Sequence, residues 1–193
     1  MVQKILKRSE IKTFKIKYYC EKRDPDSESK MHKVLVVYKQ VEMQFDENGN
    51  IIVQKEGPMV HTISCDEKPG IQAIAITGDD LRLTTEKSCV YRDYEYKRLG
   101  TLSLIAGIDL LTGIAIPVVS ETHKSSDFIT LLEKLDLIYP EGDMIRIICD
   151  NHSAHRSKEI QHYLAMKPKG RYVFVFTPKH ASWLNLIECF LAK

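Results

Sequence analysis

Hydrophobic residues recur at helical spacing early in the chain and form alternating or continuous apolar runs further along. Asp24 suits the N-cap position of a helix and Pro25 its first turn. The apolar residues that follow over 31–41 recur every three or four positions, which predicts an amphipathic helix. Residues 46–50 are typical of a turn, and residues 51–54 are expected to form a short strand.

From residue 59 onward, the pattern indicates a mixed α/β domain. Strands are predicted over residues 59–66, 99–110, 114–120, 144–150 and 171–177. Pro69 and Gly70 favour a type II turn after the first of these strands. Further helices are expected to begin at Ser125 or Ser126, at Ser157 and at Ser182. Antiparallel strands followed by alternating helices and strands predict one mixed sheet flanked by helices.

Three acidic residues, each beside a cysteine, are candidate metal ligands. Asp66 and Asp150 follow apolar runs of β type, and Glu188 lies on a helical pattern near the end of the sequence. Mg²⁺ takes oxygen ligands and usually only a few carboxylates, which leaves positions for water and phosphate. Two such ions about 4 Å apart can hold the attacking and leaving oxygens of a phosphodiester displacement. The sequence therefore predicts a carboxylate metal site that acts on a nucleic-acid backbone.

Each acid also has a simpler interpretation. Asp66 and Asp150 suit turns at strand ends, and Glu188 suits an exposed helix face. On a helical wheel, Asn185 and Glu188 share the edge of the apolar arc, from which a carboxylate can reach the sheet. That arc is expected to bury Leu184, Ile187 and Leu191 together with Trp183, Leu186 and Phe190. Stacking of Trp183 on a nucleobase is the alternative to its packing in the core.

Other candidate residues lie close to these acids in the sequence. His152 and His155 follow Asp150 in a predicted loop, where they are expected to contact DNA or to bond within the loop. A zinc site built from Cys149, Asp150 and these histidines is an alternative. Lys179 and His180 are candidate phosphate contacts or solvated loop residues. Cys65 and Cys149 are expected to be buried, because neighbouring strand residues point to opposite faces.

The net charge of +2 conceals a basic N-terminal arm, residues 1–23, with a local charge of +6. Its cations are Lys4, Lys7, Arg8, Lys12, Lys15, Lys17, Lys22 and Arg23. Such an arm is either a surface that contacts DNA phosphates or a solvated tail. Five cysteines without CxxC spacing favour reduced thiols over a disulfide framework. Without an apolar run of membrane-spanning length, the protein is expected to be cytoplasmic.

Ordered motifs extend these predictions. The segments DEKPGIQA (66–73), RLGTLSLIAGIDLLTG (98–113), THKSSDFITLL (122–132), DNHSAH (150–155) and FTPKHASWLNLIE (176–188) are found here. Together they resemble the DDE catalytic domain of bacterial insertion-sequence transposases in the mariner-related superfamily. The resemblance implies a ribonuclease-H-like fold and an Asp-Asp-Glu triad at Asp66, Asp150 and Glu188. It also implies cut-and-paste DNA transposition by strand cleavage and strand transfer, with a preference for TA targets.

The resemblance sets the remaining expectations. Two Mg²⁺ ions are expected per site, with Mn²⁺ as a substitute, and a homodimer is expected on DNA. Residues 1–23 are interpreted as the remnant of a helix-turn-helix region and its linker. Residues 24–193 are interpreted as the catalytic domain, truncated at its C-terminal end, with a ribonuclease-H-like core over about 56–193. The alternative function is a catalytically weak remnant that binds DNA or full-length transposase.

Overall fold

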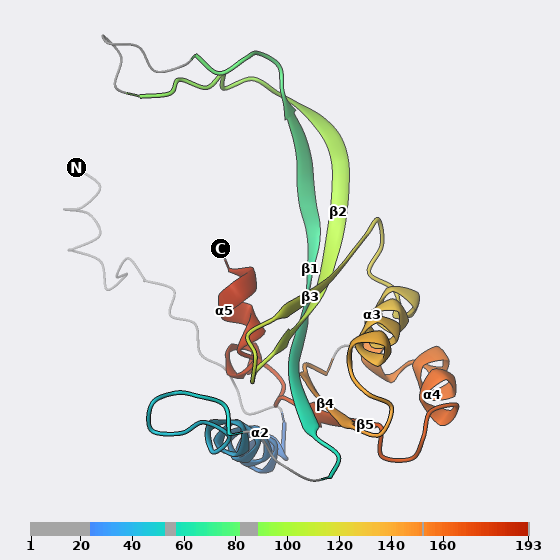
Figure 1. Ribbon diagram of the computed structural model, residues 1–193. Coiled ribbons are helices and arrows are strands. Elements are labelled where there is room, and N and C mark those ends of the chain that lie inside the picture. The colour runs from blue at the N-terminus through green and yellow to red at the C-terminus, as the bar shows by residue number, and fades with distance from the viewer. Residues whose placement is uncertain (1–23, 53–56, 82–88, 152, 193) are drawn as a thin grey trace, which may run out of the picture.

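A five-stranded mixed sheet forms the centre of the computed structural model, which describes residues 24–52, 57–81, 89–151 and 153–192 (Figure 1). The strands are β1 (Val60–Ile76), β2 (Tyr96–Asp109), β3 (Ala115–Ser120), β4 (Met144–Cys149) and β5 (Tyr172–Phe176). Their order is β3-β2-β1-β4-β5, with β1, β2 and β3 antiparallel and β4 and β5 parallel to β1. This topology confirms the predicted ribonuclease-H-like mixed sheet.

Helices cover both faces of the sheet (Figure 1). The helices are α2 (Ser27–Glu42), α3 (Ser125–Ile138), α4 (Lys158–Ala165) and α5 (Ile187–Leu191), with single 3-10 turns η1 (Ser153–Arg156) and η2 (Ser182–Leu184). The main core lies under α3 and α4, where Phe128 and Leu132 pack on Ile63 and Ile147 of the sheet. On the other face, α2 packs over β4 and β5, and α5 packs over β2. Both layers are therefore held by apolar contacts, which fix the strand ends relative to the helices.

The start of α2 differs from the sequence prediction by a few residues, whereas α3 and α4 begin close to the expected serines. Asp24 does not begin α2, since its carbonyl oxygen accepts a hydrogen bond from Ser27 and its carboxylate from the Asp26 amide. This local turn moves the helix start to Ser27. Before α3, the Asp127 carboxylate accepts a hydrogen bond from the Lys124 amide, so the helix begins at Ser125. Ser157 caps α4 as predicted.

The predicted turn at Pro69 and Gly70 is wrong. Strand β1 continues through both residues, and the pairing with β2 shifts register between Lys68 and Ile71. Gly70 has a φ of 71°, a conformation that glycine adopts without steric cost. The segment is therefore a bulge inside a long hairpin, because the partner strand β2 extends far enough to pair on both sides of it.

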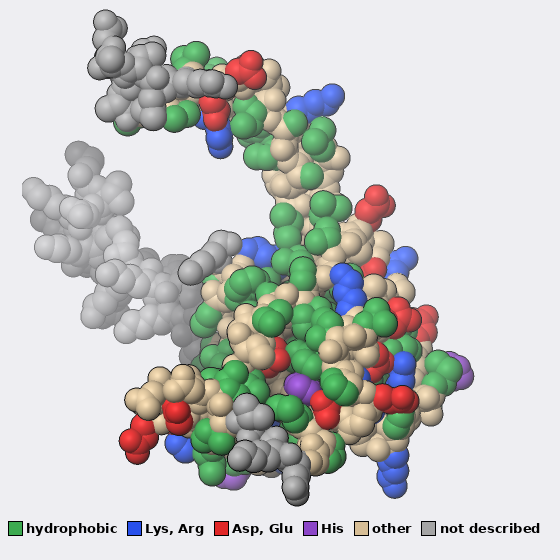
Figure 2. Space-filling model, in the orientation of Figure 1, with side chains coloured by type: hydrophobic (Ala, Val, Ile, Leu, Met, Phe, Trp, Pro, Cys, Tyr) green, Lys and Arg blue, Asp and Glu red, His purple; other side chains and the backbone are tan. Residues whose placement is uncertain are grey.

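The outer half of the β1–β2 hairpin projects from the body of the molecule (Figure 1). It carries exposed apolar side chains, which are visible along the projection in Figure 2. They are Ile71, Ile74, Ile76, Tyr96, Leu99 and Leu102. Among the described residues, no helix has the length and apolar character needed to cross a bilayer. The basic arm at residues 1–23 lies outside the described residues.

Candidate active site

Asp66 and Asp150 lie on neighbouring strands near the middle of the sheet. Asp66 is inside β1, opposite Ala106 of β2, and does not end the strand as the sequence suggested. Asp150 directly follows β4, which runs parallel to β1 with Ser64 beside Ile148. Asp66 lies two residues after Ser64, and Asp150 lies two residues after Ile148, so the two aspartates are side by side. The parallel register therefore places them together.

Glu188 reaches this place from α5, close enough for its negative charge to act on Asp66. The pKa of Asp66 rises to about 6, first because burial disfavours its charged form and then because of the negative charges of Glu188 and Asp150. The amide of Glu67 donates a 2.9 Å hydrogen bond to Asp66, which opposes the rise. Three carboxyl groups from distant segments thus interact electrostatically.

The donor set fits a divalent metal ion. Within the described part of the chain, no three His, Cys, Asp or Glu side chains already surround a common point as metal ligands. Burial and the negative charge of Glu188 instead disfavour the ionised form of Asp66, whose pKa is raised. A hard cation stabilises clustered carboxylates and takes oxygen ligands of this kind. Asp66, Asp150 and Glu188 are therefore the residues that would hold it.

The expected continuous helix from Ser182 is broken before Glu188. Asn185 is extended, with φ −88° and ψ 109°, and separates the 3-10 turn η2 from α5. Leu184, Ile187 and Leu191 are buried as predicted, whereas Trp183 is 69% exposed and Leu186 and Phe190 are also exposed. The predicted core packing of these three residues is therefore wrong, because the break at Asn185 turns them toward solvent.

The C-terminal end of α5 is anchored to β1. The Lys68 ammonium donates a hydrogen bond to the carbonyl oxygen of Leu191. A cation at a helix C-terminus also interacts favourably with the helix dipole. This contact satisfies one of the last carbonyls of the short helix that carries Glu188.

His155 is buried beside the carboxylates, with a side chain that is 1% exposed. Its Nε2 atom lies 3.5 Å from Oδ1 of Asp150 and 3.8 Å from Oε1 of Glu67. Its ring packs against Phe128, with 4.4 Å between ring centroids. This placement argues against direct contact between His155 and DNA. His152 lies outside the described residues.

Lys179 and His180 are exposed at the rim of a pocket of about 270 Å³ that also includes Asp150. Asn151, Thr177 and Ser182 complete its polar lining. The amide of Lys179 donates a 3.1 Å hydrogen bond to the Asp24 carboxylate, which ties this loop to the start of α2. The two predicted phosphate contacts are therefore close to one of the candidate metal ligands.

The alternative zinc site, of which His152 lies outside the described residues, is not supported by the residues that the structure describes. Cys149 and Cys65 are fully buried in the main core, as expected, and burial raises the pKa of both thiols. A thiol must lose its proton to bind zinc. None of the four described cysteines is in a disulfide.

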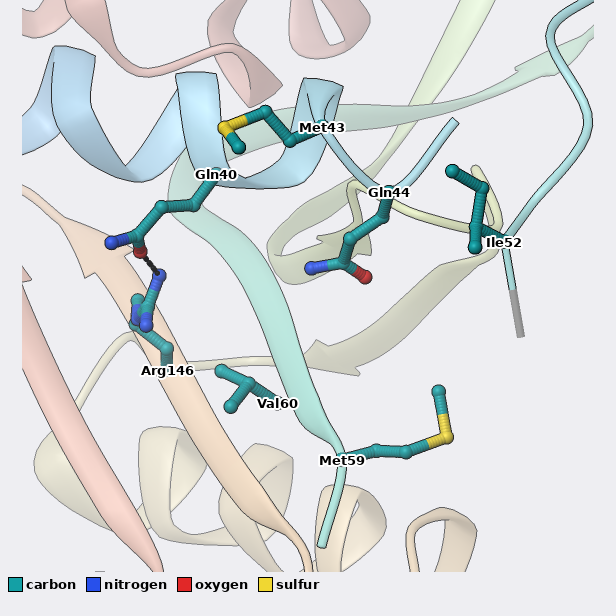
Figure 3. Close-up of a pocket in the computed structure, with 7 residues that line it drawn as sticks. All are labelled: Gln40, Met43, Gln44, Ile52, Met59, Val60 and Arg146. Carbon is teal, nitrogen blue, oxygen red and sulfur yellow. Dashed lines mark hydrogen bonds between the residues drawn. The ribbon is translucent and has the colours of Figure 1, made fainter. Parts of the chain in front are cut away.

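A separate cavity of about 380 Å³ lies at the other end of the sheet, away from the carboxylates (Figure 3). It lies between α2 and the first residues of β1, and Arg146 of β4 donates a 2.6 Å hydrogen bond to Gln40 at its edge. Its other lining residues are Met43, Gln44, Ile52, Met59 and Val60. None of the residues in this cavity is a candidate metal ligand.

Comparison with known families identifies the class of protein. The family model of the DDE superfamily endonucleases matches residues 76–193, which is more than half of the chain. The chain therefore belongs to the DDE superfamily endonucleases. The match includes Asp150 and Glu188 and begins ten residues after Asp66.

Part of the sequence is also similar to a protein of an insertion element. The chain is 34% identical over 77 residues to an uncharacterized 39 kDa protein of insertion element IS630 from Shigella sonnei. That alignment spans 40% of this chain and 22% of the relative. This similarity to a protein of an insertion element agrees with the predicted resemblance to insertion-sequence transposases.

Two solved structures show weaker similarity. The Mos1 strand transfer complex has a TM-score of 0.49 at 10% identity, over 99% of this chain and 54% of that one. The mariner Mos1 paired end complex with Mg has a TM-score of 0.35 at 11% identity, over 85% and 47%. The chain thus spans about half the length of these proteins.

Sequence reasoning assigned no role to three residues at this site. Glu67 approaches His155, while Ser64 and Asn185 are buried and hydrogen-bonded to each other. For two of them, the position in the sequence could have indicated a place beside the carboxylates. Ser64 shares a strand face with Asp66, and Asn185 precedes Glu188 by three residues.

Proposed function

We propose that this chain is the catalytic domain of a transposase that cleaves DNA strands and joins them to target DNA in a metal-dependent reaction. The observation that carries the proposal is the meeting of Asp66, Asp150 and Glu188, which interact electrostatically although they come from three segments. Membership of the DDE superfamily endonucleases supports the same class of chemistry.

The carboxylates would act as ligands, each from a different element. Asp66 lies in the middle of β1, which pairs with β2 on one side and with β4 on the other. Asp150 directly follows β4. When bound, divalent cations would activate the attacking hydroxyl and stabilise the charge that develops on the phosphate. Lys179 and His180 line the pocket that includes Asp150, which supports a role beside an entering DNA strand. Their role in this proposal is to contact its phosphates.

Finer features follow from the family resemblance. Two Mg²⁺ ions would occupy the site and Mn²⁺ would replace them. The DNA partners would be transposon ends and target DNA at TA sites, held by a homodimer. The basic residues of the arm, Lys4 to Lys17, would add contacts to phosphates that do not depend on sequence. The reaction would take place in the cytoplasm.

The proposal is tested with plasmid DNA and purified protein in Mg²⁺ or Mn²⁺. Nicking is expected with either metal, and Ca²⁺ is expected to bind without supporting turnover. Asp66→Asn and Asp150→Asn should each abolish nicking while far-UV circular dichroism stays unchanged. Asp80→Asn is the matched control, because Asp80 lies on the outer hairpin and pairs with Arg92.

Retained nicking in both single variants would refute the assignment of the carboxylates. If the folded wild-type chain binds DNA and Mn²⁺ but never nicks, the chain is the catalytically weak remnant. Strand transfer is measured in the same reactions with DNA that carries the element's ends.

A further inference from the structure

Asn185 is a buried polar residue three positions before Glu188. Its side chain is fully buried, and its backbone leaves the helical conformation immediately before the turn that carries Glu188. Asparagine has two donors and two acceptor lone pairs, and leaving them unsatisfied in the core is costly. A buried asparagine at this point therefore needs specific partners.

Those partners are on β1, next to Asp66. The amide nitrogen Nδ2 of Asn185 donates a 2.7 Å hydrogen bond to the carbonyl oxygen of Cys65. The Ser64 hydroxyl donates a 2.5 Å hydrogen bond to Oδ1 of Asn185 and accepts one of 3.0 Å from the Ile187 amide. The Asn185 carbonyl in turn accepts a 3.0 Å hydrogen bond from the Glu188 amide.

This network begins where the pairing between β1 and β4 ends. That pairing runs from Val60 to Ser64 of β1, so the Cys65 carbonyl lies just beyond it. The Asn185 side chain bonds to this carbonyl, where β4 no longer pairs with β1, and so connects the segment before α5 to the sheet. A short chain of buried hydrogen bonds thus connects the residues next to Asp66 with the segment that carries Glu188.

We propose that Asn185, together with Ser64, is a positioning residue that holds Glu188 at the distance from Asp66 required for metal binding. The inference rests on the proposed function, because it assumes that the two carboxylates share a metal ion. Partners that orient metal ligands typically change metal affinity by 10- to 100-fold when they are removed. A buried polar network also fixes one arrangement among several that an apolar core would accept.

The test is isothermal titration calorimetry of the 193-residue chain with Mn²⁺ alone. Asn185→Leu preserves size and removes the hydrogen bonds, and Ser64→Ala is a milder second variant in case the first fails to fold. Each should weaken Mn²⁺ binding at least tenfold, and hydrogen exchange at the amides of 187–191 should accelerate. Where nicking is measurable, kcat should fall and KM for DNA should stay unchanged.

Thr62→Val is the matched control. Thr62 lies on the same strand face as Ser64 and is also buried, but its hydroxyl has no hydrogen-bond partner among the described residues. Its Mn²⁺ affinity should equal that of the wild type. Wild-type affinity in folded Ser64→Ala and Asn185→Leu would overturn the inference. If Asp66→Asn binds Mn²⁺ as well as the wild type does, the proposed metal site itself is refuted.

Discussion

At the residue scale, Asp66 is half-buried between two other carboxyl groups, an environment that favours its protonated form. With a pKa of about 6 in the folded chain, Asp66 holds its proton more tightly than it does after unfolding. Its contribution to stability is therefore fully present below about pH 4 and is lost as the pH rises through 6. A bound cation would offset this loss, because it stabilises the ionised form.

Asp66→Asn should accordingly be more stable than the wild type at pH 7 in metal-free buffer. The expected gain is on the order of 1–2 kcal/mol, after allowance for the partial exposure of the side chain. It should shrink to nothing near pH 4, where both side chains are neutral. Urea denaturation from pH 4 to 7.5 measures it.

The control for this measurement is Asp80→Asn. The hydrogen bond and ion pair with Arg92 lower the pKa of Asp80, so its replacement should bring no gain at pH 7. A difference between Asp66→Asn and wild type that does not change with pH would contradict the proposed environment of Asp66.

At the element scale, the pairing of β1 with β2 is tight beside the carboxylates. Gly107 of β2 pairs with Cys65, and a Cβ atom added at Gly107 would lie 2.7 Å from Cγ2 of the fully buried Ile63. Gly107→Ala should therefore destabilise the chain by about 1–3 kcal/mol through overpacking. The free energy of unfolding in urea provides the measurement.

Gly142→Ala is the matched control for that substitution. Nothing lies within 4 Å of a Cβ atom at Gly142, and its φ is outside the left-handed region. Its effect on stability should be small. Equal stability of the two variants would show that β1 and β2 are less closely packed beside Asp66 than described.

Periodicity was sufficient to predict most elements, because their apolar residues face one common core. The positions of α3, β4 and α4 follow from local spacing, and Ser157 caps α4 as expected. The bulge at Pro69–Gly70 was not predictable in this way, since it depends on how far β2 extends alongside. The break at Asn185 likewise depends on Ser64 and Cys65, which lie about 120 residues earlier in the chain.

At the scale of the whole molecule, ordered motifs select three carboxylates that interact in the fold, but their surroundings could not be predicted. His155 was expected in a loop that could contact DNA. In the fold its side chain is buried beside Asp150, which argues against that contact. Exposure of Trp183 has the same kind of cause, since it follows from the arrangement of η2 and α5. Long-range packing therefore decides which candidates can touch DNA.

Binding of DNA by the whole chain should depend strongly on salt. The arm of residues 1–23 carries a charge of +6, whereas the remainder carries −4, so phosphate contacts should come mainly from the arm. Release of counterions makes such binding weak, nearly independent of sequence and steeply reduced by salt. This dependence is measured by fluorescence anisotropy with labelled duplexes at salt concentrations from about 50 to about 200 mM.

Deletion of residues 1–17 should flatten the salt dependence, because it removes Lys4, Lys7, Arg8, Lys12, Lys15 and Lys17. Lys179→Gln is a useful comparison, since it removes one cation beside Asp150 and leaves the arm intact. Tight, sequence-specific binding by the 193-residue chain would contradict this account of its affinity.

The most direct test of the central claim is a crystal structure of the chain soaked in Mn²⁺, with anomalous diffraction data collected near the manganese edge. The claim is that Asp66, Asp150 and Glu188 together hold divalent cations. Two anomalous peaks about 4 Å apart are expected among the three carboxylates. Manganese bound elsewhere in the crystal while these carboxylates remain without it would contradict the claim.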